Sequence, residues 1–218
     1  MNILSKFDLL SHRFRGLCPV VVDIETSGFN SKKNAILEIS LITLKMIHGW
    51  LSINKTLHFH ISPFKGAHIS HDAITFNKIN IYSALRGAIT EHEAFTIIFS
   101  KIWKYVKKNN CKKAILVAHN ASFDHSFIIE TIKRIKMEDT NPFHNFAMFD
   151  TATLSGLMLG QTVLAKSCKI LGIPFDNNQA HSALYDTNRT AILFCKLVNI
   201  WKKIGYWPLN NIKLVKNL

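Results

Sequence analysis

The chain has 218 residues, of which 48% are hydrophobic, with few glycines and prolines, so it suits one packed domain and not a disordered chain. No stretch approaches the roughly 18 consecutive apolar residues of a membrane helix. The formal net charge of +13 favours a polyanionic partner such as nucleic acid, although the Lys-, Asn- and Ile-rich composition is also what an A+T-rich genome imposes by drift.

The first part of the chain predicts three strands. Residues 19–25 (PVVVDIE) form a short apolar run that ends in acids, and residues 35–45 and 56–61 are rich in β-branched and aromatic side chains. Only a few residues separate each predicted strand from the next. We therefore expect these three strands to form an antiparallel meander.

Helical spacing begins after Ser70. Thr90 precedes Glu91 and Glu93 as an N-cap with a capping acid, and apolar residues then repeat at three- and four-residue steps as far as Val106. The remaining predicted elements are a strand at 113–118, a helix at 122–136, a strand at 146–150 and helices after 151, with turns near 160 and 172–174. This alternation requires parallel crossovers, so the sequence predicts an α/β fold with a mixed sheet flanked by helices.

Two acids close the first predicted strand. Asp23 and Glu25 are two residues apart, so on a strand both side chains face the same side. Unpaired carboxylates at the end of a buried strand are costly without cations, and carboxylate oxygens are the ligands that Mg²⁺ prefers. Taken alone, such a pair more commonly marks a salt-bridged strand end.

A third acid lies where a predicted strand changes to a helix, in the segment HNASFD at 119–124. This position puts Asp124 in the first turn of a helix at the carboxyl edge of the sheet, where open sheets bind ligands. Alone, Asp124 is better explained as an acid that complements the helix macrodipole.

The segment AHSALYD at 180–186 supplies a histidine and a fourth acid. Residues five apart on an ideal helix differ by about 140° in direction, so His181 and Asp186 do not share a helix face. If both reach one site, Asp186 lies on the helix and His181 on the preceding loop. Four carboxylates of this kind can hold two metal ions about 3.5–4 Å apart, and an imidazole can accept a proton from water near neutral pH.

Three of these segments resemble the motifs of the DEDD exonuclease superfamily, in its histidine-bearing branch: VDIETSGF at 22–29, HNASFD at 119–124 and HSALYD at 181–186. Five further segments resemble the ribonuclease T family within that branch: RFRG at 13–16, LHFH at 57–60, NPFH at 141–144, LGQTV at 159–163 and QAHSALYDT at 179–187. The resemblance covers about residues 13–209 and implies one exonuclease domain over residues 1–218.

The resemblance implies an RNase H-like fold with a mixed five-stranded sheet, a homodimer, and Mg²⁺-dependent 3′-to-5′ trimming of single-stranded 3′ ends of tRNA and other stable RNAs. It also implies activity on single-stranded DNA ends. Asp23, Glu25, Asp124 and Asp186 match the positions that hold two Mg²⁺ ions, and His181 matches the general base. Asp150 matches a family residue near the site, and we expect it to support the site and not to bind metal.

The same resemblance implies a set of nucleic-acid contacts. Terminal bases are held between phenylalanines that correspond to Phe29, Phe76, Phe123 and Phe146, although with 15 Phe in the chain most are expected in the core. A basic patch that serves the partner protomer corresponds to Arg13, Arg15, Lys107 and Lys113.

The chain departs from the family in two places. Asp72 stands where the family usually has a Glu that contacts a terminal base, and its side chain is one methylene shorter. Glu138 and Asp139 stand where the family tends to be basic, and Lys112 or Lys136 are candidates to compensate.

Two other functions remain as alternatives: a proofreading-type DNA exonuclease subunit, and a catalytically silent nucleic-acid-binding module. Loss of a metal carboxylate would favour the silent module, but all four are present with His181. The opening residues lack the features of a signal peptide, and the four cysteines form no Cys-x-x-Cys pair. We therefore expect a cytoplasmic protein.

Overall fold

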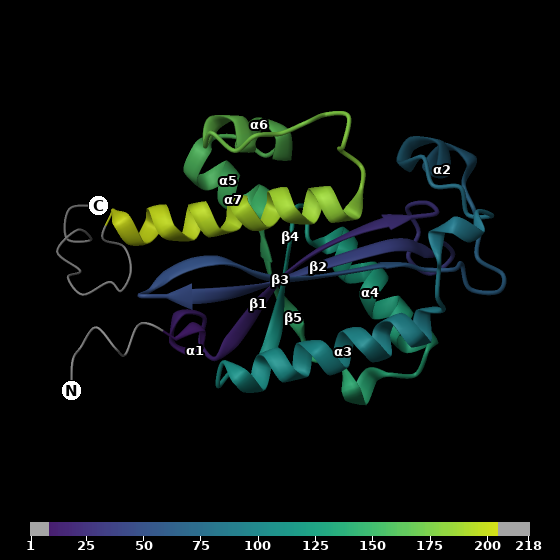
Figure 1. The fold of residues 1–218 in the computed structure, drawn as a ribbon, viewed down its shortest axis with the longest axis horizontal. Coiled ribbons are helices and arrows are strands. Elements are labelled where there is room, and N and C mark those ends of the chain that lie inside the picture. Colours follow the sequence, from purple (N-terminus) through teal and green to yellow (C-terminus); the bar gives the residue numbers. More distant parts are fainter. Residues whose placement is uncertain (1–8, 205–218) are drawn as a thin grey trace.

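A twisted five-stranded sheet runs through the middle of the molecule in the computed structural model, which describes residues 9–204 (Figure 1). The strand order is β3-β2-β1-β4-β5. The strands are β1 (Leu17–Thr26), β2 (Ile36–Ile47), β3 (Trp50–His60), β4 (Lys113–Ala118) and β5 (Phe143–Asp150).

The sheet is mixed, as the sequence predicts. β1 pairs antiparallel with β2, and β2 pairs antiparallel with β3. On its other side β1 pairs parallel with β4, which pairs parallel with β5. The carboxyl ends of β1, β4 and β5 therefore lie at one edge of the sheet, and the segments that follow these strands can meet there.

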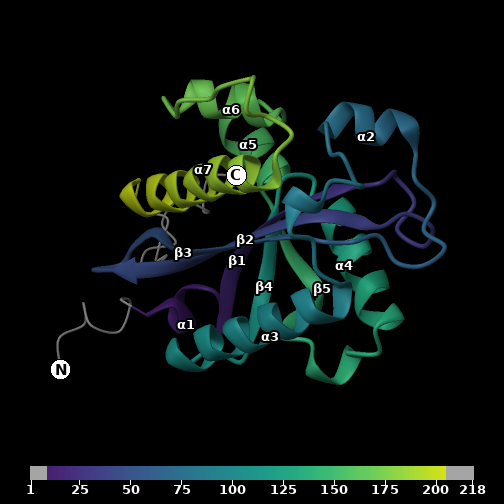
Figure 2. The same ribbon diagram turned by 45° about the vertical axis from the view of Figure 1, so that its right-hand side comes forward.

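Helices cover both faces of this sheet (Figures 1 and 2). α3 (Glu91–Lys108) and α4 (Ser122–Arg134) cover one face, while α7 (Ala183–Lys203) crosses the other with α5 (Thr151–Leu159) and α6 (Leu164–Ile170) packed behind it. The remaining elements are α1 (Leu10–Arg13), α2 (His71–Asn77) and two 3₁₀ turns, η2 (Ala84–Arg86) and η3 (Glu138–Thr140). Within residues 9–204, no helix has the length and apolar character to cross a membrane.

Burial explains why the sheet holds its register. The side chains of Val20, Val21 and Val22 on β1 are fully buried, as are most of those on β4, because helices cover both faces.

α3 begins with the predicted capping box, in which Thr90 Oγ1 accepts from the N–H of Glu93 and the Glu93 carboxylate accepts from the N–H of Thr90.

Two predicted strands begin too late. β3 begins at Trp50, six residues before the predicted start, because His48 and Gly49 take positive φ values and make a tight hairpin that the composition of residues 50–55 conceals. β5 begins at Phe143 and not at 146, since a bulge between its pairs with Ala114 and Leu116 interrupts the pattern of the strand.

The C-terminal part is helical where described, with the predicted turns at Gly160 and Gly172, both in the left-handed conformation. One stretch departs from the prediction: residues 171–182 form no helix, and α7 begins only at Ala183. α4 ends at Arg134, two residues before the predicted end. The helical prediction beyond residue 204 lies outside the described residues.

Candidate active site

The carboxyl end of β1 carries two acids on one face. Asp23 and Glu25 alternate with the buried side chains of Val22 and Ile24, so both carboxylates face the side of the sheet that α7 covers. Across the ladder Asp23 pairs with Ser40 and Glu25 pairs with Glu38 on β2. The predicted convergence of the two acids is therefore present.

α7 brings the third acid to the same point. One carboxylate oxygen each from Asp23, Glu25 and Asp186 lie within 4.8 Å of one another. Asp186 lies in the first turn of α7, its Oδ2 accepts the backbone N–H of His181, and its Oδ1 is buried without a hydrogen-bond partner in the described structure. A buried oxygen of this kind among three carboxylates fits a cation ligand.

Asp124 approaches the same group from α4. Asp124 is only 4% exposed, and the backbone of Asp124 itself and of Ile24, the residue between the two β1 acids, acts to lower its pKa against the effect of burial. Its negative charge acts directly on Asp23. All four predicted acids therefore gather at one edge of the sheet, with Asp124 beside the three whose oxygens lie closest together.

The electrostatics show that burial and mutual repulsion of these acids outweigh the positive charge near them. Burial, followed by repulsion from Glu38, Asp186 and Asp124, raises the pKa of Glu25 to about 8. Burial also raises the pKa of Asp124 to about 8, raises that of Asp23 well above its ordinary value with added repulsion from Asp124, and raises that of Asp186. Oxygen-only donors with such mutual repulsion fit hard divalent cations.

His181 lies on the loop before α7, where the helical geometry argument predicts it. Its backbone takes a left-handed φ of 66°, which is uncommon for a histidine and costs on the order of 1 kcal/mol. The hydrogen bond from its N–H to Asp186 Oδ2 (3.0 Å) helps to hold that conformation. Its ring packs on the ring of Phe76, with 4.2 Å between centroids.

A hydrogen-bonded turn supports Asp124. Asp150 caps α5 and accepts from the backbone N–H of Asn120 (2.8 Å) and of Ala152 (3.0 Å) and from Thr153 Oγ1 (2.8 Å). Burial alone would raise the pKa of Asp150, but these hydrogen bonds lower it below the ordinary value. Asp150 is thus engaged with the turn before α4, and its supporting role stays a prediction.

Three of the predicted stacking phenylalanines surround this edge of the sheet. Phe29 is 89% exposed and its ring lies 6.3 Å from that of Phe123 at the start of α4. Phe76 is 62% exposed at the end of α2, against His181. The fourth, Phe146, is 86% exposed on the bulge of edge strand β5, beside His144.

Gly28 explains how Phe29 is presented. A Cβ on Gly28 would lie 2.5 Å from Asn34 Nδ2, so only glycine fits there. Asn34 in turn donates to the carbonyls of Ser27 (3.2 Å) and His68 (2.7 Å) and fixes the turn after β1. The turn leaves the Phe29 ring in solvent.

The polar residues that are expected to contact nucleic acid lie in two different places on the molecule. Asp72 is exposed in the first turn of α2, four residues before Phe76. Arg13 and Arg15 precede β1, and Lys107 ends α3, all at the opposite end of the sheet from the carboxylates. Lys113 begins β4 there, but its Nζ donates to the carbonyl of Asn141 (2.9 Å) and lies 5.7 Å from the Trp103 ring, so it is already engaged.

Sequence reasoning missed Glu38 as part of the site. It lies directly across the ladder from Glu25, is 6% exposed, and its charge raises the pKa of Asp23, Glu25 and Asp186. The signal was available, because Glu38 is the one charged residue in the mostly apolar run AILEISLITL of a strand expected beside β1.

Comparison with known proteins agrees with this geometry. The model of the exonuclease family RNase_T matches residues 20–194. Ribonuclease T of Buchnera aphidicola subsp. Schizaphis graminum (strain Sg) is 57% identical over 218 residues, covering 100% of this chain and 99% of the relative. Ribonuclease T of Yersinia pseudotuberculosis serotype O:1b is 56% identical over 206 residues, covering 94% of this chain and 95% of the relative.

Solved structures share the fold at lower identity. The nuclease domain of 3′hExo, a DEDDh family member solved bound to rAMP, superposes with a TM-score of 0.66 at 19% identity, covering 84% of this chain and 92% of that one. E. coli exonuclease I in complex with a dT13 oligonucleotide gives a TM-score of 0.67 at 15% identity, covering 86% of this chain and 42% of that one. The RNase H-like exonuclease fold expected from the sequence is thus confirmed. The chain is an exonuclease that belongs to the ribonuclease T family.

Proposed function

We propose that this exonuclease removes nucleotides one at a time from single-stranded 3′ ends of tRNA and other stable RNAs, releasing 5′-mononucleotides, and that it also shortens single-stranded DNA ends. The observation that carries the proposal is the convergence of three carboxylates within 4.8 Å, with Asp124 beside them and His181 on the adjoining loop. The family uses divalent metal ions, and the donors here are all carboxylate oxygens.

In the proposed mechanism Asp23, Glu25, Asp124 and Asp186 would hold two Mg²⁺ ions. When bound, such a pair activates the attacking water and stabilises the charge on the leaving oxygen. His181 accepts the proton of that water, since it lies on a loop tied to Asp186 by its own N–H and not on the rigid helix. Asp150 holds the turn that carries Asp124 in place.

Three exposed phenylalanines and the half-buried Phe123 would grip the end of the strand. Base–aromatic stacking contributes about 1–3 kcal/mol per base and tolerates any base, so Phe29, Phe76, Phe123 and Phe146 would set affinity more than sequence. Asp72, one turn before Phe76 on α2, is the candidate for contact with the terminal base. Its shorter side chain predicts a different base preference from that of relatives with Glu.

We further propose a homodimer in which the basic residues of one protomer serve the active site of its partner. Residues 17 and 23 on β1 are about 20 Å apart at roughly 3.3 Å per residue, so Arg13 and Arg15 lie far from the carboxylates of their own chain. Beside these arginines, apolar side chains of β5, α5 and α7 line a groove of about 510 Å³, and Leu157 on its rim is 77% exposed. Such an apolar surface fits a subunit contact.

The proposal includes one domain and a cytoplasmic location. The family match covers residues 20–194, which include the four acids, β2 to β5 and all of β1 except its first three residues. The cysteines Cys18, Cys111, Cys168 and Cys195 are free thiols, which suits a reducing compartment.

The test is a gel assay on RNA labelled at its 5′ end and carrying a short single-stranded 3′ overhang. We expect a one-nucleotide ladder in Mg²⁺ that is absent in EDTA and absent for Asp23→Asn. The matched control is Asp139→Asn, which removes an exposed acid on η3, away from the carboxylate group, and should leave the ladder intact. Tight RNA binding without shortening in Mg²⁺ would instead identify a silent binding module.

A further inference from the structure

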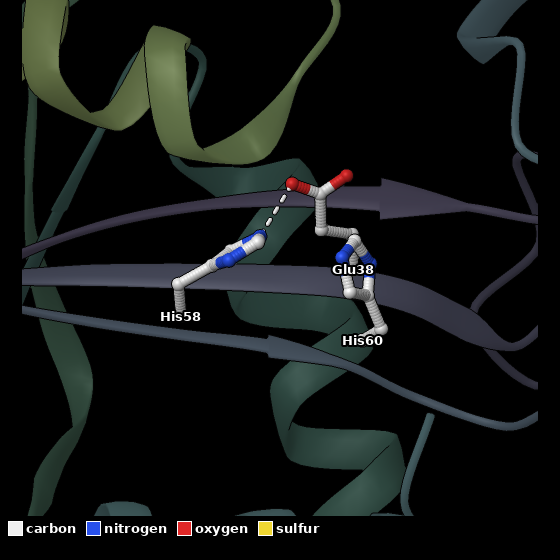
Figure 3. A group of neighbouring side chains, drawn as sticks. All are labelled: Glu38, His58 and His60. Atoms are coloured by element: carbon white, nitrogen blue, oxygen red, sulfur yellow. Dashed lines mark hydrogen bonds and ion pairs between the residues drawn. The ribbon is translucent and has the colours of Figure 1, made fainter. Parts of the chain in front are cut away.

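A second group of potential metal ligands lies beside the carboxylate site. Glu38 lies on β2 and His58 and His60 lie on β3, and one ligand atom from each lies within 4.8 Å of the others. Figure 3 shows the three side chains projecting from neighbouring strands toward one another. His58 Nε2 and Glu38 Oε1 are 2.7 Å apart.

The strand register explains why this group forms. Glu25, Glu38 and His60 lie in one cross-strand row over β1, β2 and β3, and Asp23, Ser40 and His58 lie in the neighbouring row. Residues directly opposite in a ladder point to the same face. The histidines therefore extend the row of catalytic carboxylates sideways, with Glu38 between the two groups.

The hydrogen bonding of this group is incomplete. His60 Nδ1 is buried and has no hydrogen-bond partner in the described structure, although a carboxylate and a second imidazole lie next to it. Glu38 is only 6% exposed, while the rings of His58 and His60, 4.8 Å apart between centroids, are half-buried and reachable from solvent. A buried ring nitrogen without a protein partner needs another one, and beside a carboxylate and a second imidazole a metal ion is a candidate.

We propose that Glu38, His58 and His60 bind a divalent cation of the Zn²⁺ type at a site separate from the Mg²⁺ site. Two imidazoles and one carboxylate are a donor set that Zn²⁺ accepts readily, whereas Mg²⁺ prefers oxygen alone. With bonds of about 2.0–2.2 Å, ligand atoms on one such ion lie roughly 3–3.5 Å apart, so small side-chain rotations suffice. Three protein ligands leave a coordination position open to solvent.

Arg86 on η2 sets a limit on the strength of this site. Its Nη2 donates to the carbonyls of Leu37 (2.7 Å) and Ile61 (3.4 Å), and its positive charge acts on both Glu38 and His60. A fixed positive charge nearby weakens the binding of a cation and favours one that forms strong bonds to nitrogen. Removing that charge with Arg86→Gln is therefore expected to tighten Zn²⁺ binding.

The test is isothermal titration of the full-length protein with Zn²⁺ in a buffer saturated with Mg²⁺, which fills the carboxylate site first. We expect one Zn²⁺ per chain in the wild type, and affinity at least ~10-fold weaker in His60→Gln, the lower end of the loss seen when even an outer-shell partner of a bound metal is removed. His58→Gln should weaken binding similarly, and circular dichroism confirms that each variant is folded. His92→Gln, an exposed histidine on α3, is the matched control and should bind like the wild type.

A further variant separates this site from the proposed catalytic site. Asp23→Asn should abolish RNA shortening and leave Zn²⁺ binding in Mg²⁺ intact. Loss of Zn²⁺ binding in Asp23→Asn would show that the ion had entered the carboxylate site, and unchanged binding in folded His58→Gln and His60→Gln would show that the histidines are not ligands. Either result overturns the proposal, and neither depends on whether the chain shortens RNA.

Discussion

At the scale of single residues, the four acids hold their protons more tightly than free carboxyls do, and this makes stability depend on pH. Glu25 and Asp124 have pKa values near 8 in the folded chain, whereas unfolded carboxyls release protons near pH 4. Between about pH 4 and pH 8 the folded state therefore binds more protons than the unfolded state. The free energy of unfolding of metal-free protein should then fall as pH rises through that window.

Added Mg²⁺ should reverse this dependence, because it binds only the deprotonated carboxylates. We expect the Tm to rise on adding Mg²⁺ more at pH 8 than at pH 5.5, measured by thermal melting in EDTA and in Mg²⁺. Asp23→Asn, which removes one charge from the group, should reduce both the pH dependence and the Mg²⁺ effect. A metal-free Tm that stays flat or rises between pH 5.5 and pH 8 would contradict the clustering of uncompensated acids.

His181 differs from the acids in its contacts, because its backbone N–H donates to Asp186 while its ring packs against Phe76. If it accepts the proton of the attacking water, His181→Ala should lower kcat by about 10²- to 10⁴-fold, with little change in RNA affinity. Single-turnover kinetics and filter binding measure the two quantities separately, and added imidazole should restore part of the rate. An equal loss of rate and affinity would instead mean that His181 and its stacked partner Phe76 mainly hold RNA.

At the scale of elements, the sequence predicts the sheet and the main helices well, because β1, β4 and α3 have strong local signals. Two apolar-faced strands and a capping box need no distant partner to be recognised. The early starts of β3 and β5 are not predictable in the same way, since they depend on pairing with β2 and on a bulge against β4. Tertiary pairing, and not composition, sets those bounds.

The loop at 171–182 is another such case, and α7 holds it in place. Tyr185 Oη accepts the backbone N–H of Asp176, and Arg189 donates to the carbonyl of Pro174 (2.7 Å) while lying 5.0 Å from the Tyr185 ring. Both contacts reach back to the loop that ends in His181. Periodicity reports only the helix itself, so sequence patterns do not reveal this anchoring.

Tyr185→Phe tests whether the anchoring matters for catalysis. Loss of one hydrogen bond costs about 1 kcal/mol, or roughly 2–4 °C in Tm for a chain of this size. Because His181 would then be held less firmly, we expect kcat to fall while KM changes little. Tyr82→Phe, on an 89% exposed side chain, is the matched control. Wild-type kcat in Tyr185→Phe would mean that the loop needs no such anchor.

At the scale of the whole molecule, the length of the parallel strands β1 and β4 separates the carboxylates from the basic residues. Asp23 and Glu25 lie at the carboxyl end of β1, and Asp124 and Asp186 reach the same edge from the first turns of α4 and α7. Arg15 and Lys107 lie at the opposite end of the sheet. The sequence locates the acids because their spacing has a chemical reason. It does not locate the basic residues, since lysines are spread along this chain and only the fold gathers some of them. Glu138 and Asp139, at positions where the family tends to be basic, lie on η3. Lys112 is exposed beside Gly16, so it is a further candidate for binding phosphate at the basic end of the sheet.

The separation of the two ends predicts how charge contributes to binding. Each lost phosphate contact with a single strand should reduce the slope of log K against log salt by about 0.7. Arg15→Gln combined with Lys107→Gln should therefore flatten the slope by about 1.4 while leaving kcat at saturating RNA unchanged. Lys166→Gln combined with Lys169→Gln, which removes two exposed lysines of α6, is the control for loss of two charges elsewhere. An equal reduction of the salt slope in both double variants would mean that only the net charge of the protein matters for binding, and not the position of these residues.

A mixing experiment decides which active site these basic residues serve. The Asp23→Asn protomer has a dead site and an intact basic end, and the Arg15→Gln, Lys107→Gln protomer has the reverse. If the basic end serves the partner, the intact active site of one protomer in a mixed dimer is served by the intact basic end of the other. The activity at low RNA concentration should then rise above the average of the two separate proteins. If the basic end serves its own chain, no mixed dimer contains a complete unit and activity stays at that average. Co-expression with two different tags, followed by tandem purification, isolates the mixed dimer for this measurement.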